Sequence, residues 1–292
     1  MGIRSQGDPA QSYNDVFGDT GNVDAPSASP SPSGDGIAAS GGTMTTYSTP
    51  PGASYKSHTF TSSGSFVVTA APPSPSFDIQ FLVQGGGGGC IAQIGGNRAA
   101  GSGAGGLVLG PAGTMPAATY PITIGGGGSE SNGSNTVLNG VGPSGQTALG
   151  GGTGGAGDPA PGCNGGPGGC GGGGWYTGPG AKGDATQPTN SPGLSGITNL
   201  GYDGAAGNGS PEYGGAGGGT GGAATGQGTN KGPGTPNVWR FGPTNAQTYG
   251  AGGSASDYPS TNRNADGGAN TGDGASGYAD GGAGIVVIRY LL

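Results

Sequence analysis

Large apolar side chains are concentrated in two parts of this chain and are scarce between them. Of the 36 Leu, Ile, Val and Phe residues, 26 lie in residues 57–149 and 285–292. The stretch between these parts, 150–284, holds 47 glycines in 135 residues and only five Leu, Ile, Val or Phe. A segment so poor in large side chains cannot build an ordinary hydrophobic core. We therefore expect a β-rich base, formed by 57–149 and 285–292, from which the glycine-rich stretch projects.

Short apolar runs predict the strands of this base. The clearest is 77–84, where Phe77, Ile79, Phe81 and Val83 alternate with polar residues over most of the run. Shorter strands are expected at 107–109, 120–124, 136–138 and 147–149, with Tyr120, Ile122 and Ile124 pointing inward.

Two further patterns complete the predicted base. The run 285–290 is apolar almost without interruption, which is typical of a central strand covered on both faces. Residues 59–61 and 66–68 flank a serine- and glycine-containing turn, which indicates a hairpin. The expected fold class is mainly β and irregular, a small antiparallel β-sandwich with almost no α-helix.

Glycine content leaves two structural options for 150–284. Glycine and proline together make up 102 of 292 residues, which is typical of disorder. However, only 8% of residues are charged, so self-repulsion is weak. The ordered option is a bundle of polyproline-II (polyglycine-II) helices, which have three residues per turn and pair their N–H and C=O groups between helices. Because both ends of the stretch run into predicted strands, we favour the ordered bundle.

The first 56 residues differ in composition from the rest. Residues 1–21 carry Tyr13, Val16 and Phe17, and Tyr13 and Phe17 are spaced to share a helical face, which indicates a short docking peptide. Residues 22–56 are interpreted as a Ser/Pro/Gly linker. The chain shows no signal-peptide pattern and no run of 18 apolar residues, so we expect a product made in the cytoplasm and not inserted in a membrane.

Five glycine- and strand-containing segments carry a family resemblance. They are FTSSGSF at 60–66, FLVQ running into Gly85–Gly89, GAGGL at 103–107, YPITIGGGG at 120–128, and GGAGIVVIRY at 281–290. In order and spacing, residues 57–292 resemble the glycine-rich domain of bacteriophage tail-fibre proteins and adhesins. The resemblance implies layered polyglycine-II helices and distal loops that contact a host receptor. More weakly, the segments 1–4 and 12–17 resemble the start of marine phage virion proteins.

Catalytic and metal chemistry is poorly represented. His58 is the single histidine and is expected at a surface position, with no acidic partner at a recognisable spacing. Cys90, Cys163 and Cys170 form no C-x-x-C pair, so zinc is not indicated; buried thiols, or a Cys163–Cys170 disulfide, remain open. Oxygen-rich residues near Asp266 and Asp273 match no calcium motif and fit Asx turns. We expect no enzyme activity, cofactor or metal.

Aromatic residues are the most informative side chains of the glycine-rich stretch. Because non-glycine inserts should form loops at the ends of a glycine bundle, we expect loops at 174–182 and 235–264. Aromatic side chains in such loops offer large contact areas at low entropic cost, although some could only cap the bundle. The candidate receptor-binding residues are Trp175, Tyr176, Tyr213, Trp239, Phe241, Tyr249 and Tyr258.

These patterns lead to one main functional hypothesis and two alternatives. The main one is a phage virion surface protein that docks on other virion proteins through residues 1–21 and attaches to a host glycan or outer-membrane protein. It would be a homo-oligomer, with a trimer favoured. A structural or decoration protein of the capsid or tail is the first alternative, and an ice-binding protein is a remote second. The net charge of −7 and only eight Lys and Arg residues argue against nucleic-acid binding.

Overall fold

The structure is a computed structural model, and it describes part of the chain. The described residues are 36–70, 79–91, 99–156, 164–175, 181–188, 194–209, 212–255 and 265–292. The chain divides into two units, Met1–Gly36 and Ile37–Leu292, and all the described strands belong to the second unit. The predicted docking peptide with Tyr13, Val16 and Phe17 lies outside the described residues.

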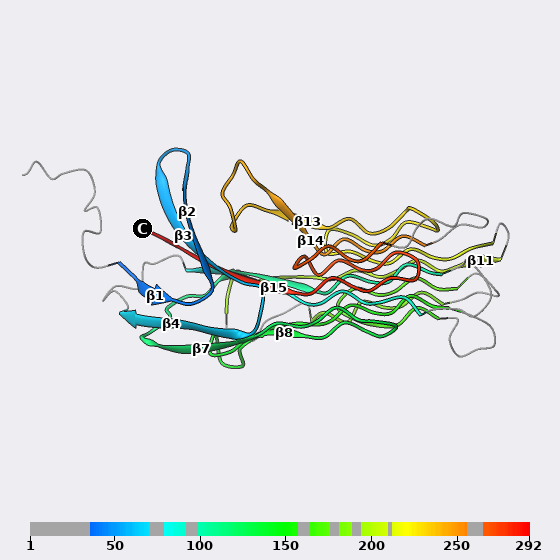
Figure 1. The fold of residues 1–292 in the computed structure, drawn as a ribbon, viewed down its shortest axis with the longest axis horizontal. Helices are drawn as coiled ribbons and strands as arrows, with labels where there is room; N and C mark the ends of the chain where they lie inside the picture. Colours follow the sequence, from blue (N-terminus) through cyan, green and yellow to red (C-terminus); the bar gives the residue numbers. More distant parts are fainter. Residues whose placement is uncertain are drawn as a thin grey trace, which may run out of the picture. The chain divides into compact units, whose positions relative to one another are not determined.

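Two antiparallel sheets form the base of the unit (Figure 1). The larger has the strand order β10 (Thr198–Leu200), β6 (Leu107–Pro111), β5 (Gln80–Gln84), β15 (Ile285–Leu291), β3 (Ala53–Phe60) and β2 (Thr43–Thr49). The smaller has the order β1 (Ala38–Ser40), β4 (Gly64–Ala70), β7 (Ala118–Thr123), β8 (Thr136–Leu138) and β9 (Gln146–Ala148). Two short pairs complete the set, β11 (Asn208–Gly209) with β12 (Glu212–Tyr213), and β13 (Thr235–Asn237) with β14 (Gln247–Tyr249). The described residues contain no helix, so the fold is mainly β, with sandwich-like sheets as predicted.

The main hydrophobic core joins side chains from both sheets. It includes Phe66, Tyr120 and Leu138 from the smaller sheet and Phe81 and Ile288 from the larger, all at most 3% exposed. A second cluster lies on the other face of the larger sheet, and its members are Leu82, Leu107, Tyr249, Ile285 and Val287. Strand β15 therefore contributes to both clusters and lies between β5 and β3, which confirms the prediction of a central strand covered on both faces.

Two local predictions in the first part of the base are wrong. Strands β1, β2 and the start of β3 lie within residues 22–56, where a linker was expected. Threonine and tyrosine side chains favour an extended strand here, and β2 pairs with β3 along its whole length. The predicted hairpin across residues 59–68 is also absent, because β3 and β4 belong to different sheets and residues 61–63 cross from one sheet to the other.

Glycine-rich segments continue from the sheets as long runs joined by backbone hydrogen bonds (Figure 1). Residues 85–90 show the pattern most clearly, with six successive N–H groups donating at 2.8–3.2 Å. The N–H groups of residues 85 and 88 donate to carbonyl oxygens in 103–106. Those of residues 86 and 89 donate to carbonyls in 131–134, and those of residues 87 and 90 to carbonyls in 279–282. The direction of donation thus repeats every three residues. The carbonyls of this run accept from Gly128, from Gly151 and Gly154, and from Ala275, so six segments surround it.

Residues 100–106 repeat this arrangement. The N–H groups of residues 100, 103 and 106 donate to carbonyl oxygens in 149–155. Those of residues 101 and 104 donate to carbonyls in 215–218, and those of residues 102 and 105 to carbonyls in 272–275, all at 2.8–3.2 Å. Nearly all of these contacts join backbone to backbone, so an added side chain has little room. A Cβ atom built on Gly87 would lie 1.9 Å from the carbonyl oxygen of Asp273, and one on Gly101 would lie 2.0 Å from that of Gly253. Backbone approach at these two positions therefore requires glycine, whereas Cys90, Ala100, Ser102 and Ala104 occupy other positions of the runs.

Polar side chains replace the backbone acceptors in some of these contacts, and they keep the spacing of three. The Oδ1 atoms of Asn132 and Asn135 accept from the N–H groups of Thr153 and Gly150. In the same way, Asp273 Oδ1 accepts from Ala251 and Ser276 Oγ accepts from Ser254. Asparagine, aspartate and serine in this region thus satisfy main-chain donors of other segments. The bond from Ala251 to Asp273 is not the local Asx turn that was expected, because the two residues are 22 positions apart.

Candidate functional site

The predicted receptor-binding aromatics do not form one surface. Trp175 is 1% exposed and Tyr249 is fully buried, so these two side chains are structural and are not available to a partner. Phe241 is 38% exposed, whereas Tyr213 and Trp239 are partly buried. Tyr176 and Tyr258 lie outside the described residues.

Trp239 belongs to a cluster built around the guanidinium group of Arg289. The guanidinium carbon lies 4.6 Å from the centre of the Trp239 ring and 4.6 Å from that of Tyr55, as in cation–π contacts. Arg289 Nε donates to Gln80 Oε1 at 2.6 Å, and Nη1 donates to the Tyr47 hydroxyl at 3.3 Å. That hydroxyl in turn donates to the Trp239 carbonyl oxygen at 2.9 Å. The cluster therefore binds the segment around Trp239 to β2, β3 and β15.

This cluster places the β13–β14 hairpin at the base. Ser57 Oγ donates to the Arg240 carbonyl oxygen at 3.1 Å, and Tyr249 packs in the cluster on the outer face of the larger sheet. The residues between β13 and β14 thus cover the sheet instead of extending beyond the glycine-rich runs. In contrast, β11 lies at the end of these runs remote from β4 and β7 (Figure 1), and Tyr213 of β12 pairs with Asn208 of β11. Of the predicted set, Tyr213 is the described residue best placed at that end.

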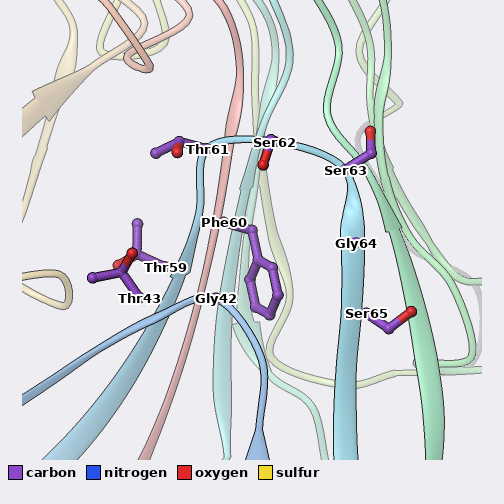
Figure 2. Close-up of a pocket in the computed structure, with 9 residues that line it drawn as sticks. All are labelled: Gly42, Thr43, Thr59, Phe60, Thr61, Ser62, Ser63, Gly64 and Ser65. Carbon is purple, nitrogen blue, oxygen red and sulfur yellow. The ribbon is translucent and has the colours of Figure 1, made fainter.

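A small hydroxyl-lined pocket lies where the chain crosses between the two sheets (Figure 2). Its volume is about 290 Å³, and its lining residues are Gly42, Thr43, Thr59, Phe60, Thr61, Ser62, Ser63, Gly64 and Ser65. Gly41 and Gly42 both have positive φ angles, 109° and 62°, and pass close to the buried Phe60 ring. Ser63 Oγ accepts from the N–H of Ile124, which fixes the crossing segment to the smaller sheet.

The pocket offers neutral hydrogen-bonding groups but no catalytic set. Its side-chain oxygens are all hydroxyls, and a serine or threonine hydroxyl needs a nearby base to act as a nucleophile. His58 is adjacent in sequence to Thr59, yet both of its ring nitrogens are occupied. Nδ1 lies 2.7 Å from the Gly41 carbonyl oxygen and Nε2 lies 3.1 Å from the Tyr290 hydroxyl. The arrangement suits the binding of a small neutral polar group.

His58 itself is fully buried, which corrects the expectation of a surface histidine. The ring stacks on Tyr290 at 5.7 Å and meets Phe66 edge-on at 5.0 Å. Because Phe66 belongs to the smaller sheet, His58 contacts both layers of the base. Burial away from water lowers the pKa of His58, and the neutral form is therefore favoured in the folded protein.

The two described cysteines are free and buried, and they have no features of a reactive site. Burial raises the pKa of Cys90 and of Cys170 to about 12, so neither thiol ionises near neutral pH. Cys163, the suggested partner of Cys170, lies outside the described residues. Within the described ranges, no group of three or more His, Cys, Asp or Glu side chains is placed to hold a metal ion.

Sequence reasoning missed the cluster of Arg289 with Tyr47 and Tyr55, because both tyrosines were assigned to a linker. The high threonine content of 43–49, with one tyrosine, was the signal available for a strand there. No helix among the described residues is long and apolar enough to cross a membrane. The chain matches no protein-family model, and no curated protein matches its sequence.

Proposed function

We propose that this protein is a non-catalytic component of a phage virion surface that attaches to a host-cell receptor through segments at the far end of its glycine-rich domain. The observation that carries the proposal is the threefold repeat of donor direction in residues 85–90, with six surrounding segments. A repeat of three matches the geometry of polyproline-II helices, and close approach of such helices matches a polyglycine-II bundle. The same architecture is implied by the resemblance to tail-fibre and adhesin domains.

A bundle of this kind suits presentation of a binding surface. Its cohesion comes from main-chain hydrogen bonds, so segments that join the runs are free to vary without loss of a side-chain core. Among described residues at the end remote from the sheets, β11 and β12 carry Tyr213, which could stack on a sugar or a protein loop. The predicted contact residues Tyr176 and Tyr258 belong to this proposal as well.

Attachment is tested with fluorescently labelled full-length protein on a panel of bacterial strains. We expect saturable binding to some strains, with a loss of tenfold or more for Tyr213→Ala. Tyr202→Ala is the matched control, because Tyr202 is 40% exposed but was not among the predicted contact residues. Equal binding of both variants on a strain that binds the wild type would refute the assignment of Tyr213.

A structural or decoration role in the capsid or tail is the second candidate. It is favoured by the burial of Trp175 and Tyr249 and by the engagement of Trp239 with Arg289, which remove three aromatics from the predicted contact surface. In that case no strain binds the purified protein, and incorporation into virions depends on residues 1–21. Labelling the protein in virion images distinguishes a fibre tip from a capsid or tail-tube position.

A further inference from the structure

Strand β2 is a sheet edge of unusual length for this fold. The other edge strands of the two main sheets, β1, β9 and β10, have three residues each, whereas β2 has seven. Short edge strands are a common protection against pairing with another chain, as are charged residues and prolines within the strand. Strand β2, with the sequence TMTTYST, has neither device within its bounds. Prolines follow only at positions 50 and 51, after the strand ends.

Composition and exposure also favour pairing along this edge. Four of the seven residues are threonine and one is tyrosine, residue types that are enriched in strands. Met44 is 58% exposed, the most exposed large apolar side chain among the described residues, and Thr46 and Ser48 are exposed beside it. The Trp239 segment reaches this region through the Tyr47 side chain, and no backbone hydrogen bond from it to β2 is found in the described part of the chain.

We propose that β2 pairs antiparallel with β2 of a second copy of this chain. An uncharged strand can meet its own copy without like-charge repulsion, and threonine–threonine pairs are favourable across strands. The resulting dimer has twofold symmetry and joins two six-stranded sheets edge to edge. This inference does not depend on the proposed attachment function.

The register follows from the geometry of antiparallel pairing. Residues that exchange hydrogen bonds face each other, so both must direct their N–H and C=O groups away from β3. Along β2, every second residue directs its N–H and C=O groups away from β3. A symmetric pairing must therefore place odd-numbered residues opposite odd-numbered ones and even-numbered residues opposite even-numbered ones. The register that pairs all seven residues places Thr46 opposite Thr46 of the second copy.

The self-pairing of Thr46 gives a charge-swap test. Thr46 is exposed, but its cross-strand neighbour on β3 is Lys56, so circular dichroism must first show that each substituted chain keeps the wild-type fold. In sedimentation analysis of the full-length protein we expect a concentration-dependent dimer. Thr46→Lys should shift the wild-type dimer to monomer, because two ammonium groups would face each other beside Lys56. Thr46→Glu should weaken the dimer less, because Lys56 lies opposite position 46 within each chain. Mixing the two variants should restore a dimer that contains one copy of each.

The matched control is Thr198→Lys on β10, an exposed threonine on the opposite edge of the same sheet, which should leave the dimer unchanged. Thr46→Cys should form a disulfide-linked dimer under mild oxidation, since facing residues in an antiparallel pair lie within disulfide range. The proposal is overturned if the wild type is monomeric at every concentration. A dimer that survives Thr46→Lys, or fails to re-form in the mixture, overturns it too.

Discussion

Replacement of Gly87 by alanine should destabilise the glycine-rich domain through a single methyl group. The added Cβ would lie 1.9 Å from the carbonyl oxygen of Asp273, and real Cβ contacts are essentially never below 3.0 Å. One of the two runs must therefore move by about 1 Å. Three hydrogen bonds depend on the present positions: Gly87 N–H to Gly282, Gly128 N–H to Gly87, and Gly282 N–H to Asp273.

The magnitude follows from these three bonds. Each contributes about 1 kcal/mol net, and a buried donor or acceptor left without a partner costs about 1–3 kcal/mol. We expect Gly87→Ala to lower the free energy of unfolding by about 3–5 kcal/mol. In a domain of this size, 1 kcal/mol corresponds to about 2–4 °C in melting temperature. The melting temperature should therefore fall by roughly 6 °C or more in a calorimetric scan.

Gly126→Ala is the matched control. Gly126 lies in a neighbouring run, but a Cβ there would have no atom within 4 Å. Alanine restricts the unfolded chain more than glycine does, so this change should stabilise the protein by about 0.4–1 kcal/mol. Equal effects of the two substitutions would show that backbone approach at Gly87 is not what holds the domain together.

Three other predictions concern buried or partly buried side chains. Folding lowers the pKa of His58, so on acidification the unfolded protein protonates this imidazole at a higher pH than the folded protein does. Stability, measured as the urea midpoint, should therefore fall as the pH drops below about 6.5. His58→Gln should flatten that slope, and an unchanged slope would assign the effect to other groups. Arg289→Lys removes the planar guanidinium group that contacts both Trp239 and Tyr55. We expect the free energy of unfolding to fall by about 1–2 kcal/mol and tryptophan emission to shift to the red. Arg240→Lys is the comparison. Cys90 and Cys170 should react with an aromatic disulfide reagent only after unfolding; rapid native-state labelling of both would contradict their burial.

Periodicity predicted the strands that carry the main core. Alternation over Ile79, Phe81 and Val83 located β5, and all three side chains are buried. The apolar run at 285–290 located β15 and its central place, because a strand covered on both faces needs apolar residues at odd and even positions alike. Local pattern and burial agree in these segments.

Strands without that pattern were missed for physical reasons. Residues 43–49 contain one methionine and no Leu, Ile, Val or Phe, so they lack the signal of a buried face and were assigned to a linker. The hairpin over 59–68 failed because local turn chemistry does not determine whether two strands pair or enter different sheets. Among the aromatics, Tyr249 is buried against residues of the larger sheet that are distant in the sequence, and spacing along the chain does not reveal such a contact.

Amide hydrogen exchange across residues 85–90 and 100–106 tests the backbone lattice most directly. All six N–H groups of 85–90 donate to other segments, so consecutive amides should exchange slowly, as slowly as those of β5 and β15. Exchange within seconds throughout both runs, while β5 and β15 stay protected, would contradict the account. It would mean that the glycine-rich segments are not held by the hydrogen bonds described above.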